Sequence, residues 1–229
     1  LEKSSSPTDG SLTLNKVLTG RDMAAGEFGF VMTGTSENAQ GMSATGTNTA
    51  AVDGEAGSVT LSAITFQEPG TYEFQISEVN NNLGGIGYDG ATLKAVANVL
   101  SDGKGNMEIG WTIYNADGTE ISDYTYNNTY TASPTSVILG GTKVLDGRTL
   151  ADGEFNFELH DADGNVLQTV ANNAEGGIVF DKITYDAEGT YEYTISEVAG
   201  DAEGITYDDT TYTAKVVVTD DGQGSFKVS

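Results

Sequence analysis

The chain has 229 residues, which is enough for two domains that each bury a core. Its formal net charge of −24 argues against nucleic acid and anionic membranes as partners, and no apolar run is long enough for membrane insertion. The 30 glycines and 3 prolines accompany many Thr, Val and Tyr residues, a composition typical of an all-β chain.

The first predicted strand, "SLTLNKVL" at residues 11–18, has a charged residue on its apolar face. Leu12, Leu14 and Leu18 alternate along one side of the strand, and Lys16 lies on that same side. A Lys near the start of a strand usually extends its amine to water, so Lys16 alone does not indicate a functional site.

A later strand, "TYEFQISEV" at residues 71–79, has a carboxylate in a similar place. Tyr72, Phe74 and Ile76 form its apolar face, and the next residue on that face is Glu78. A Glu at the end of a strand is more often solvated than buried, so this residue also has an ordinary explanation.

The strand "DYTYNNTY" at residues 123–130 adds a carboxamide. Tyr124, Tyr126 and Tyr130 share one face with Asn128. Because Asn127 is adjacent, the register stays open, and Asn128 could instead be a turn residue.

An internal repeat gives two of these three polar residues a second copy. The stretches at 15–30, 63–79 and 85–99 match those at 142–157, 182–198 and 204–218. Lys16 therefore corresponds to Lys143, and Glu78 corresponds to Glu197. We predict a first domain at residues 1–131, a linker at 132–136 and a second domain at 137–229.

Turns containing glycine separate the predicted strands, at residues 102–106, 115–120, 161–165 and 219–224. Short strands at this spacing predict that each domain is a β-sandwich. By the repeat, Ser229 corresponds to Gly110, so within this sequence we expect the second domain to lack its last strand and a partner Asn for Lys143. The open sheet edge could then accept a donor strand.

The three polar residues of the first domain together indicate one covalent reaction. Burial lowers the pKa of a Lys and raises the pKa of a Glu, which allows both to be neutral and avoids a cost of several kcal/mol for each buried charge. A neutral amine can attack the Asn carboxamide while a protonated Glu passes protons to the leaving ammonia. We expect Phe28, Phe30, Phe74 and Tyr126 to exclude water. The product would be a Lys–Asn isopeptide bond.

The stretches "NKVLTGRDMAAGEFGF", "GTYEFQISEV", "GIGYDGATLKAVANV" and "YNNTY" resemble the streptococcal pilin isopeptide-linkage domain of major pilins and Gram-positive adhesin stalks. The resemblance covers nearly the whole chain and implies immunoglobulin-like sandwiches of the reversed type. It also implies that Lys16 and Asn128 form the bond and that Glu78 is the catalytic acid. Lys143 and Glu197 would be their counterparts in the second copy, whose partner Asn is absent from this chain.

The same resemblance implies a structural protein and not an enzyme, because the bond forms once, by autocatalysis, without cofactor or metal. The module would be extracellular, on the cell-wall-anchored surface of a Gram-positive bacterium. Its partners would be neighbouring domains or subunits of the same stalk or pilus, together with the possible donor strand. A polymerising pilin and a single-chain adhesin stalk both fit, and the host receptor is unspecified.

Other extracellular functions are alternatives with weaker support. A calcium-dependent adhesion module could use "DADGN" at 161–165, but this stretch lacks the closing Glu of an EF-hand loop. A carbohydrate-binding module could use Trp111, but Tyr114 would point to the opposite face of the strand. A glycosidase would need its two carboxylates to flank one cleft, whereas the two Glu residues identified above occupy separate repeats.

Overall fold

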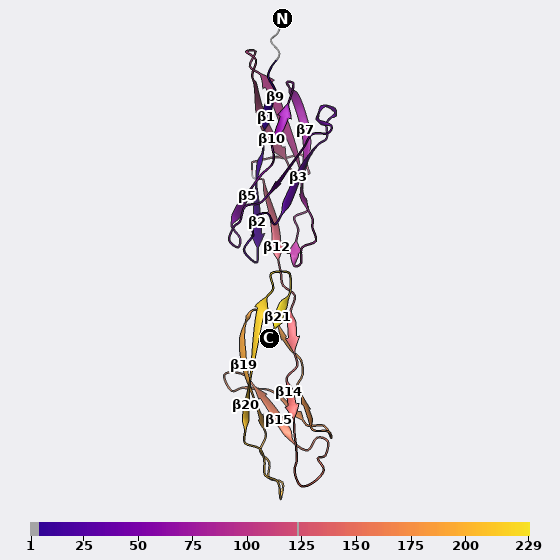
Figure 1. The fold of residues 1–229 in the computed structure, drawn as a ribbon, viewed down its shortest axis with the longest axis vertical. Coiled ribbons are helices and arrows are strands. Elements are labelled where there is room, and N and C mark those ends of the chain that lie inside the picture. The colour runs from indigo at the N-terminus through magenta and orange to yellow at the C-terminus, as the bar shows by residue number, and fades with distance from the viewer. Residues whose placement is uncertain (1–4, 123) are drawn as a thin grey trace. The chain divides into compact units, whose positions relative to one another are not determined.

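The chain folds into two compact units, residues 1–131 (unit 1) and 132–229 (unit 2), and each consists mainly of β-strands (Figure 1). The computed structural model describes residues 5–122 and 124–229. Within these residues the only helical element is the 3₁₀ turn η1 (Glu37–Ala39), so no described helix could cross a membrane. The all-β prediction is therefore confirmed.

Unit 1 is a sandwich of two sheets. Its strands are β1 (Thr8–Gly10), β2 (Thr13–Thr19), β3 (Gly29–Gly34), β4 (Ser43–Thr47), β5 (Ala56–Thr60), β6 (Ile64–Phe66), β7 (Gly70–Val79), β8 (Ile86–Gly87), β9 (Thr92–Ser101), β10 (Met107–Tyr114), β11 (Glu120–Ile121) and β12 (Thr125–Tyr130). One sheet has the order β11-β10-β9-β7-β3-β4 and the other has the order β5-β2-β12-β8. Strands β1 and β6 form a separate pair.

Unit 2 repeats the larger sheet of unit 1. Its strands are β13 (Thr135–Val137), β14 (Gly140–Thr142), β15 (Asn156–His160), β16 (Val166–Ala171), β17 (Gly177–Val179), β18 (Ile183–Tyr185), β19 (Gly189–Glu197), β20 (Thr211–Asp220) and β21 (Phe226–Val228). The order β16-β15-β19-β20-β21 matches β4-β3-β7-β9-β10, and the other strands form the pairs β13-β18 and β14-β17. Among the described strands of unit 2, none corresponds to β8 or β12.

Glycine turns join neighbouring antiparallel strands, as the sequence predicts. Residues 102–106 connect β9 to β10, and Gly103 and Gly105 have φ values of 69° and 105°, which other residues rarely adopt. The predicted turns at 115–120, 161–165 and 219–224 connect β10 to β11, β15 to β16 and β20 to β21.

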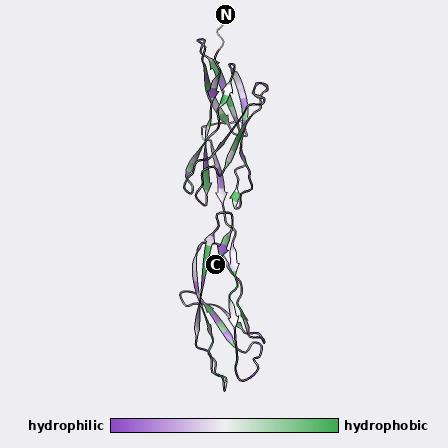
Figure 2. Cartoon of the chain, in the orientation of Figure 1, coloured by the Kyte–Doolittle hydropathy of each residue, from purple (hydrophilic) through white to green (hydrophobic). Residues whose placement is uncertain are grey.

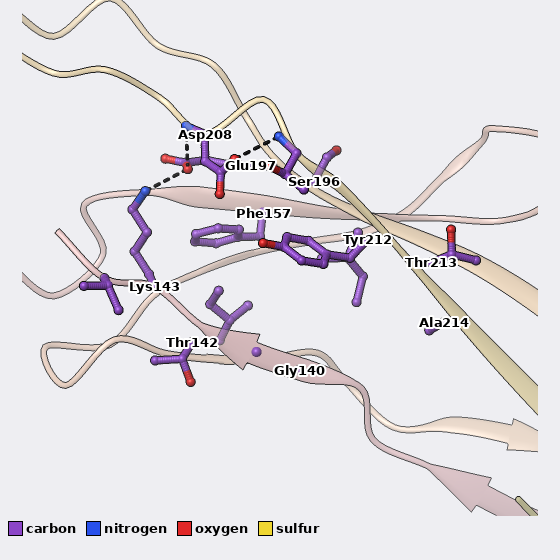
Figure 3. A pocket seen from close by; sticks show the side chains of 15 residues that line it. Gly140, Thr142, Lys143, Phe157, Ser196, Glu197, Asp208, Tyr212, Thr213 and Ala214 are labelled. Atoms are coloured by element: carbon purple, nitrogen blue, oxygen red, sulfur yellow. Dashed lines mark hydrogen bonds and ion pairs between the residues drawn. The ribbon is translucent and has the colours of Figure 1, made fainter.

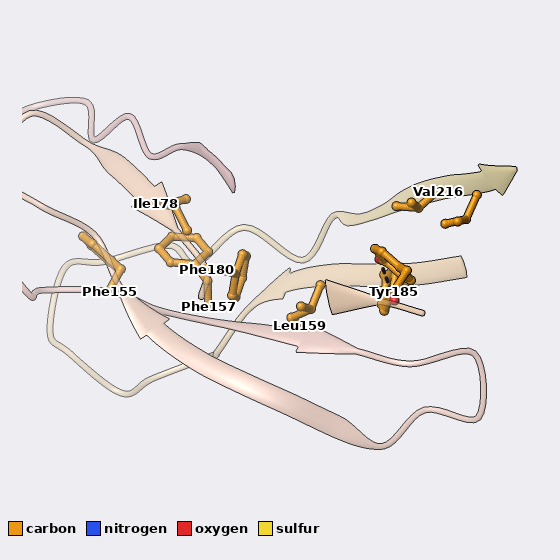
Figure 4. Close-up of a cluster of buried hydrophobic side chains, with 9 residues drawn as sticks. Phe155, Phe157, Leu159, Ile178, Phe180, Tyr185 and Val216 are labelled. Atoms are coloured by element: carbon orange, nitrogen blue, oxygen red, sulfur yellow. Dashed lines mark hydrogen bonds between the residues drawn. The ribbon is translucent and has the colours of Figure 1, made fainter. Parts of the chain in front are cut away.

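Alternation along the strands places the predicted apolar faces in the two cores. In β7, the residues Tyr72, Phe74 and Ile76 are buried. Hydrophobic and hydrophilic residues accordingly lie next to each other along the strands of both units (Figure 2). The core of unit 2 (Figure 4) consists of Phe155, Phe157, Leu159, Ile178, Phe180, Tyr185, Tyr193, Val216 and Val218.

Two element boundaries differ from the sequence-based expectation. Strand β1 precedes the strand expected to be first and pairs with β6, so β2 is the second strand of unit 1. The expected linker at 132–136 is part of unit 2, because β13 pairs with β18 and the N–H of Phe226 donates to the carbonyl of Ser133 at 3.1 Å. A polar segment with Pro134 resembles a linker in sequence, but its flanking backbone groups complete the sheets.

Candidate functional site

The polar residues singled out in unit 1 come from three strands that meet in its core. Lys16 lies near the middle of β2, and Asn128 lies on the parallel neighbour β12, where it is opposite Leu18. Glu78 comes from β7 in the other sheet and is opposite Phe30 of β3. The structure therefore brings Lys16, Glu78 and Asn128 together between the two sheets.

The amine of Lys16 and the carboxamide of Asn128 approach the same carboxylate oxygen. The Lys16 Nζ lies 2.9 Å from Glu78 Oε1, and the Asn128 Nδ2 donates a hydrogen bond of 2.8 Å to the same atom. The side chains of Lys16 and Glu78 are 0% and 1% exposed, and Asn128 is 1% exposed. The Lys16 amine and the Asn128 carboxamide are thus close neighbours in a buried site.

Burial shifts the pKa values of Lys16 and Glu78 toward their neutral forms. Desolvation lowers the pKa of Lys16 in spite of the nearby Glu78, and it raises the pKa of Glu78 in spite of the nearby Lys16. Among the described residues, the Lys16 Nζ and the Glu78 Oε2 have no aligned hydrogen-bond partner, which is costly for a buried charge. These effects favour a neutral amine beside a protonated carboxyl group.

Aromatic rings surround the amine. The Lys16 Nζ lies 4.8 Å from the ring centroid of Phe28 and 6.0 Å from that of Phe30. Tyr126 packs edge-on against Phe30 at 5.2 Å, and its hydroxyl donates to the Ile76 carbonyl at 3.1 Å. These rings provide the apolar wall that the proposed chemistry requires.

Phe74 belongs to a different aromatic cluster, with Phe66 and Trp111. Its ring centroid lies 6.3 Å from that of Phe66 and 5.7 Å from that of Trp111. Phe74 precedes Glu78 by four residues, or about 13 Å along an extended strand, so the prediction that it lines the amine site is wrong. Trp111 packs in this cluster, which explains its position without a carbohydrate ligand.

The structure distinguishes the two adjacent asparagines. Asn128 is buried, whereas Asn127 is exposed and its side chain donates a hydrogen bond of 3.4 Å to the Thr125 carbonyl. The N–H of Asp89 donates to the Asn128 Oδ1 at 2.7 Å, and the N–H of Asn127 donates to the Asp89 Oδ2 at 2.9 Å. Asn128 is therefore the carboxamide at the site.

Two further residues support the site although the sequence pattern did not single them out. Asp89 contacts the carboxamide directly, and its repeat partner Asp208 is the signal that could have identified it. Asn48 is buried and accepts the N–H of Phe28 at 2.7 Å, as Asn172 does for the corresponding residue of unit 2. The Asn48 and Asn172 segments lie where the copies differ in loop length, so the repeat does not align them.

In unit 2, the amine and the carboxylate lie beside an open cavity of about 580 Å³ (Figure 3). The Lys143 Nζ donates to the Glu197 Oε2 at 2.8 Å and lies 4.4 Å from the ring centroid of Phe155. The side chains of Lys143 and Glu197 are 10% and 3% exposed. The N–H of Asp208 donates to the same Glu197 Oε2 at 3.2 Å, so this carboxylate is bound by an amine and a backbone amide.

The acidic stretch at 161–165 is a hairpin turn between β15 and β16. Asp161 accepts hydrogen bonds from the N–H groups of Asp163 and Asn165 at 3.0 and 2.8 Å, which accounts for its carboxylate. Within the part of the chain that the structure describes, no group of three or more His, Asp or Glu side chains could hold a metal ion.

Comparison with known proteins gives one family match. The family model FctA, described as the Spy0128-like isopeptide containing domain, matches residues 12–131 and 139–229. The major pilin protein T-13 of Streptococcus pyogenes is 14% identical, with a TM-score of 0.43 over 98% of this chain and 97% of that chain. Another major pilin of Streptococcus pyogenes is 16% identical, with a TM-score of 0.43 over 82% of each chain. The pilus adhesin SpaC of Lactobacillus rhamnosus GG is 18% identical, with a TM-score of 0.25 over 95% of this chain and 27% of that chain. No curated protein sequence matches.

Proposed function

Because the chain belongs to the FctA family of Spy0128-like isopeptide containing domains, we propose that it is a structural module of a Gram-positive pilus shaft or adhesin stalk, stabilised by a self-formed isopeptide bond. In unit 1 the bond joins Lys16 to Asn128, and Glu78 is the acid. The observation that carries this proposal is the approach of the Lys16 Nζ and the Asn128 Nδ2 to one buried oxygen of Glu78, at 2.9 and 2.8 Å. The chain is not an enzyme, because the reaction consumes its own side chains once.

The reaction uses the neutral forms of the amine and the acid. The Lys16 Nζ forms a bond to the Asn128 Cγ, and the bond from Cγ to Nδ2 breaks as Glu78 gives its proton to the departing nitrogen. Glu78 then takes one proton from Nζ, so ammonia is the only product released and the acid is regenerated. The Phe28 and Phe30 rings exclude water, which would compete as a nucleophile.

The role of the bond is mechanical. Strands β2 and β12 are parallel neighbours close to the two ends of the unit 1 sequence, so tension applied along a stalk enters the two large sheets through them. A covalent link between them carries that tension and leaves the hydrogen-bonded sheets unloaded. We assign the module to the extracellular, cell-wall-anchored surface, where the charge of −24 opposes self-association.

For unit 2 we propose that Lys143 and Glu197 have the same roles and that the Asn comes from a donor strand. Strand β2 pairs with both β5 and β12, whereas β14 pairs only with β17 among the described strands. The remaining edge of β14 can accept a parallel strand beside the cavity that contains Lys143.

The intact mass of the purified chain tests the proposal. If Lys16 and Asn128 have reacted, the mass is lower than the sequence mass by one ammonia, about 17 Da. A protease digest should contain one branched peptide that joins β2 to β12. Glu78→Gln should keep the ammonia because the amide cannot act as the proton shuttle, while the matched change Glu197→Gln in unit 2 should leave the unit 1 bond intact.

The two neighbouring asparagines give a register control in the same measurement. Asn127→Ala should still lose ammonia, because the Asn127 side chain is exposed, whereas Asn128→Ala should not. A wild-type chain with its full sequence mass contradicts the bond itself. A Glu78→Gln chain that links as fast as wild type contradicts the role of the acid.

A further inference from the structure

We propose that the backbone amide of Asp89 is the oxyanion donor of the unit 1 reaction and that the Asp89 side chain is its positioning group; this rests on the isopeptide bond proposed above. The Asp89 N–H donates to the Asn128 Oδ1 at 2.7 Å, and the Asn128 Nδ2 donates to Glu78 at 2.8 Å. The carboxamide therefore has a hydrogen-bond donor at the atom that gains charge and an acid at the atom that leaves.

The Asp89 carboxylate fixes the direction of its own amide. Its Oδ2 accepts the N–H of Asn127 at 2.9 Å, which ties the loop to β12 one residue before Asn128. Its Oδ1 accepts the N–H of Ala91 at 2.9 Å, which closes the loop locally. Because β8 pairs with β12 just before this loop, the backbone of Asp89 is held beside the carboxamide.

The amide acts on the charge that develops during the attack. When the Lys16 Nζ bonds to the Asn128 Cγ, the π electrons of the carbonyl group move onto Oδ1, which becomes negative. A donor already at hydrogen-bond distance stabilises this charge without reorganising. When the carbonyl re-forms, the electrons of the bond to Nδ2 leave with ammonia, Glu78 supplies and recovers one proton, and the Asp89 amide keeps its own.

Unit 2 provides a second view of the same amide without a carboxamide. The Asp208 N–H donates to the Glu197 Oε2 at 3.2 Å, and the Asp208 Oδ1 accepts the N–H of Thr210 at 2.9 Å. This hydrogen bond from Thr210 to Asp208 corresponds to the hydrogen bond from Ala91 to Asp89 in unit 1. The loop thus directs its amide into the site without a carboxamide, and an Asn that enters unit 2 would compete with Glu197 for this N–H.

The charge of Asp89 is a separate effect that the test must exclude. Its carboxylate favours the protonated forms of both Lys16 and Glu78, which helps the acid but hinders the nucleophile. Asp89→Asn removes the charge and keeps one of the two acceptor oxygens, whereas Asp89→Ala removes the charge and both acceptors. Positioning predicts that Asp89→Asn, which keeps one of these contacts, links faster than Asp89→Ala.

The decisive experiment removes only the N–H. An amide-to-ester replacement at residue 89 can be introduced by cell-free synthesis with the α-hydroxy analogue of aspartate, and linking can be followed by mass in timed samples quenched with acid. Loss of one oxyanion donor should slow linking by about 100-fold. The same replacement at residue 208 is the matched control and should leave the linking rate of unit 1 unchanged.

Each outcome of this experiment bears on a different claim. A wild-type chain that never loses ammonia refutes the isopeptide bond. If wild type links and the folded ester variant at 89 links equally fast, only the role of the amide is refuted. If the ester variant does not fold, the comparison of Asp89→Asn with Asp89→Ala tests the proposal. Equal linking rates for these two folded variants would overturn the positioning role.

Discussion

Leu93 of unit 1 and Tyr212 of unit 2 occupy the same position in the repeat, yet they are 7% and 60% exposed. Leu93 lies in β9, under a facing sheet that includes β12 and β8. Tyr212 lies in the matching strand β20 and lines the open cavity of unit 2. The position is thus a core position only where the facing layer is complete.

The incomplete facing layer of unit 2 also accompanies a shorter strand next to Lys143. Strand β2 has seven residues, with Lys16 near its middle, whereas β14 has three residues and ends immediately before Lys143. A strand with a partner on each side keeps its backbone groups paired over a longer stretch than a strand at an edge. The comparison shows that β12 contributes to unit 1 as a structural strand as well as through Asn128.

Removing the cross-link should have the largest effect on the stability of unit 1 relative to unit 2. Lys16→Met opens a loop of 112 residues between positions 16 and 128, which by the entropy model used for disulfides destabilises unit 1 by about 4–5 kcal/mol. The midpoint temperature of the unit 1 unfolding transition in scanning calorimetry should fall by on the order of 15 °C. Lys143→Met is the matched control, since it removes the corresponding Lys beside a buried Glu without removing a covalent bond. Equal shifts for the two variants would contradict a cross-link in unit 1 alone.

Truncation at the shared core position should have the next largest effect. Leu93→Ala leaves a cavity under the facing sheet and should destabilise unit 1 by about 3 kcal/mol. Tyr212→Ala should change the free energy of unfolding of unit 2 by less than about 1 kcal/mol, because the ring is already exposed. Urea unfolding measures both, and a large effect at Tyr212 would show that unit 2 is closed in solution.

A donor peptide should make unit 2 resemble unit 1. A synthetic peptide with the sequence of residues 124–131 should stabilise unit 2 by about 2.7 kcal/mol at a concentration of one hundred times its Kd. If Lys143 and Glu197 are competent, the adduct should have the summed mass less one ammonia. A peptide with Ala at the position of Asn128, and the variant Lys143→Arg, should bind without linking. No thermal shift with either peptide would contradict the donor-strand proposal.

The smallest effect concerns pH. Burial lowers the pKa of Lys16 and raises that of Glu78, and the reactive neutral pair has the same number of protons as the ion pair, so their ratio does not change with pH. The linking rate of unit 1 should therefore have a plateau. At pH values below the plateau the rate should fall about tenfold per pH unit because Lys16 gains a proton. At pH values above it the rate should fall by the same factor because Glu78 loses its proton. Each tenfold change corresponds to about 1.4 kcal/mol in activation free energy. A rate that keeps rising with pH would mean that no acid is needed.

The sequence was sufficient for the parts of the site that alternation determines. Lys16, Glu78 and Asn128 are recognisable in the sequence because each interrupts an apolar face with a period of two, and that period holds in β2, β7 and β12. The pairing of strands cannot be predicted from alternation alone. Alternation shows which face a residue occupies, but it does not show that β12 would lie parallel to β2.

The repeat of Asp89 as Asp208 marks this position in the sequence, but the role of its backbone amide has no such signal. Every residue except proline has a backbone N–H, so the amide that contacts the Asn128 Oδ1 has no compositional signal. The assignment of Phe74 to the amine site failed for a related reason, because a shared face does not imply a shared position along the strand.

The parallel pairing of β2 with β12 has a consequence for how far the molecule can lengthen under load. A bond between Lys16 and Asn128 would exclude the 111 residues between them from the extensible contour. At roughly 3.4 Å per extended residue, those residues represent about 380 Å of chain that unfolding of unit 1 would otherwise release. A stalk with this link would lengthen little under load, whereas an unlinked unit would release this contour when it unfolds.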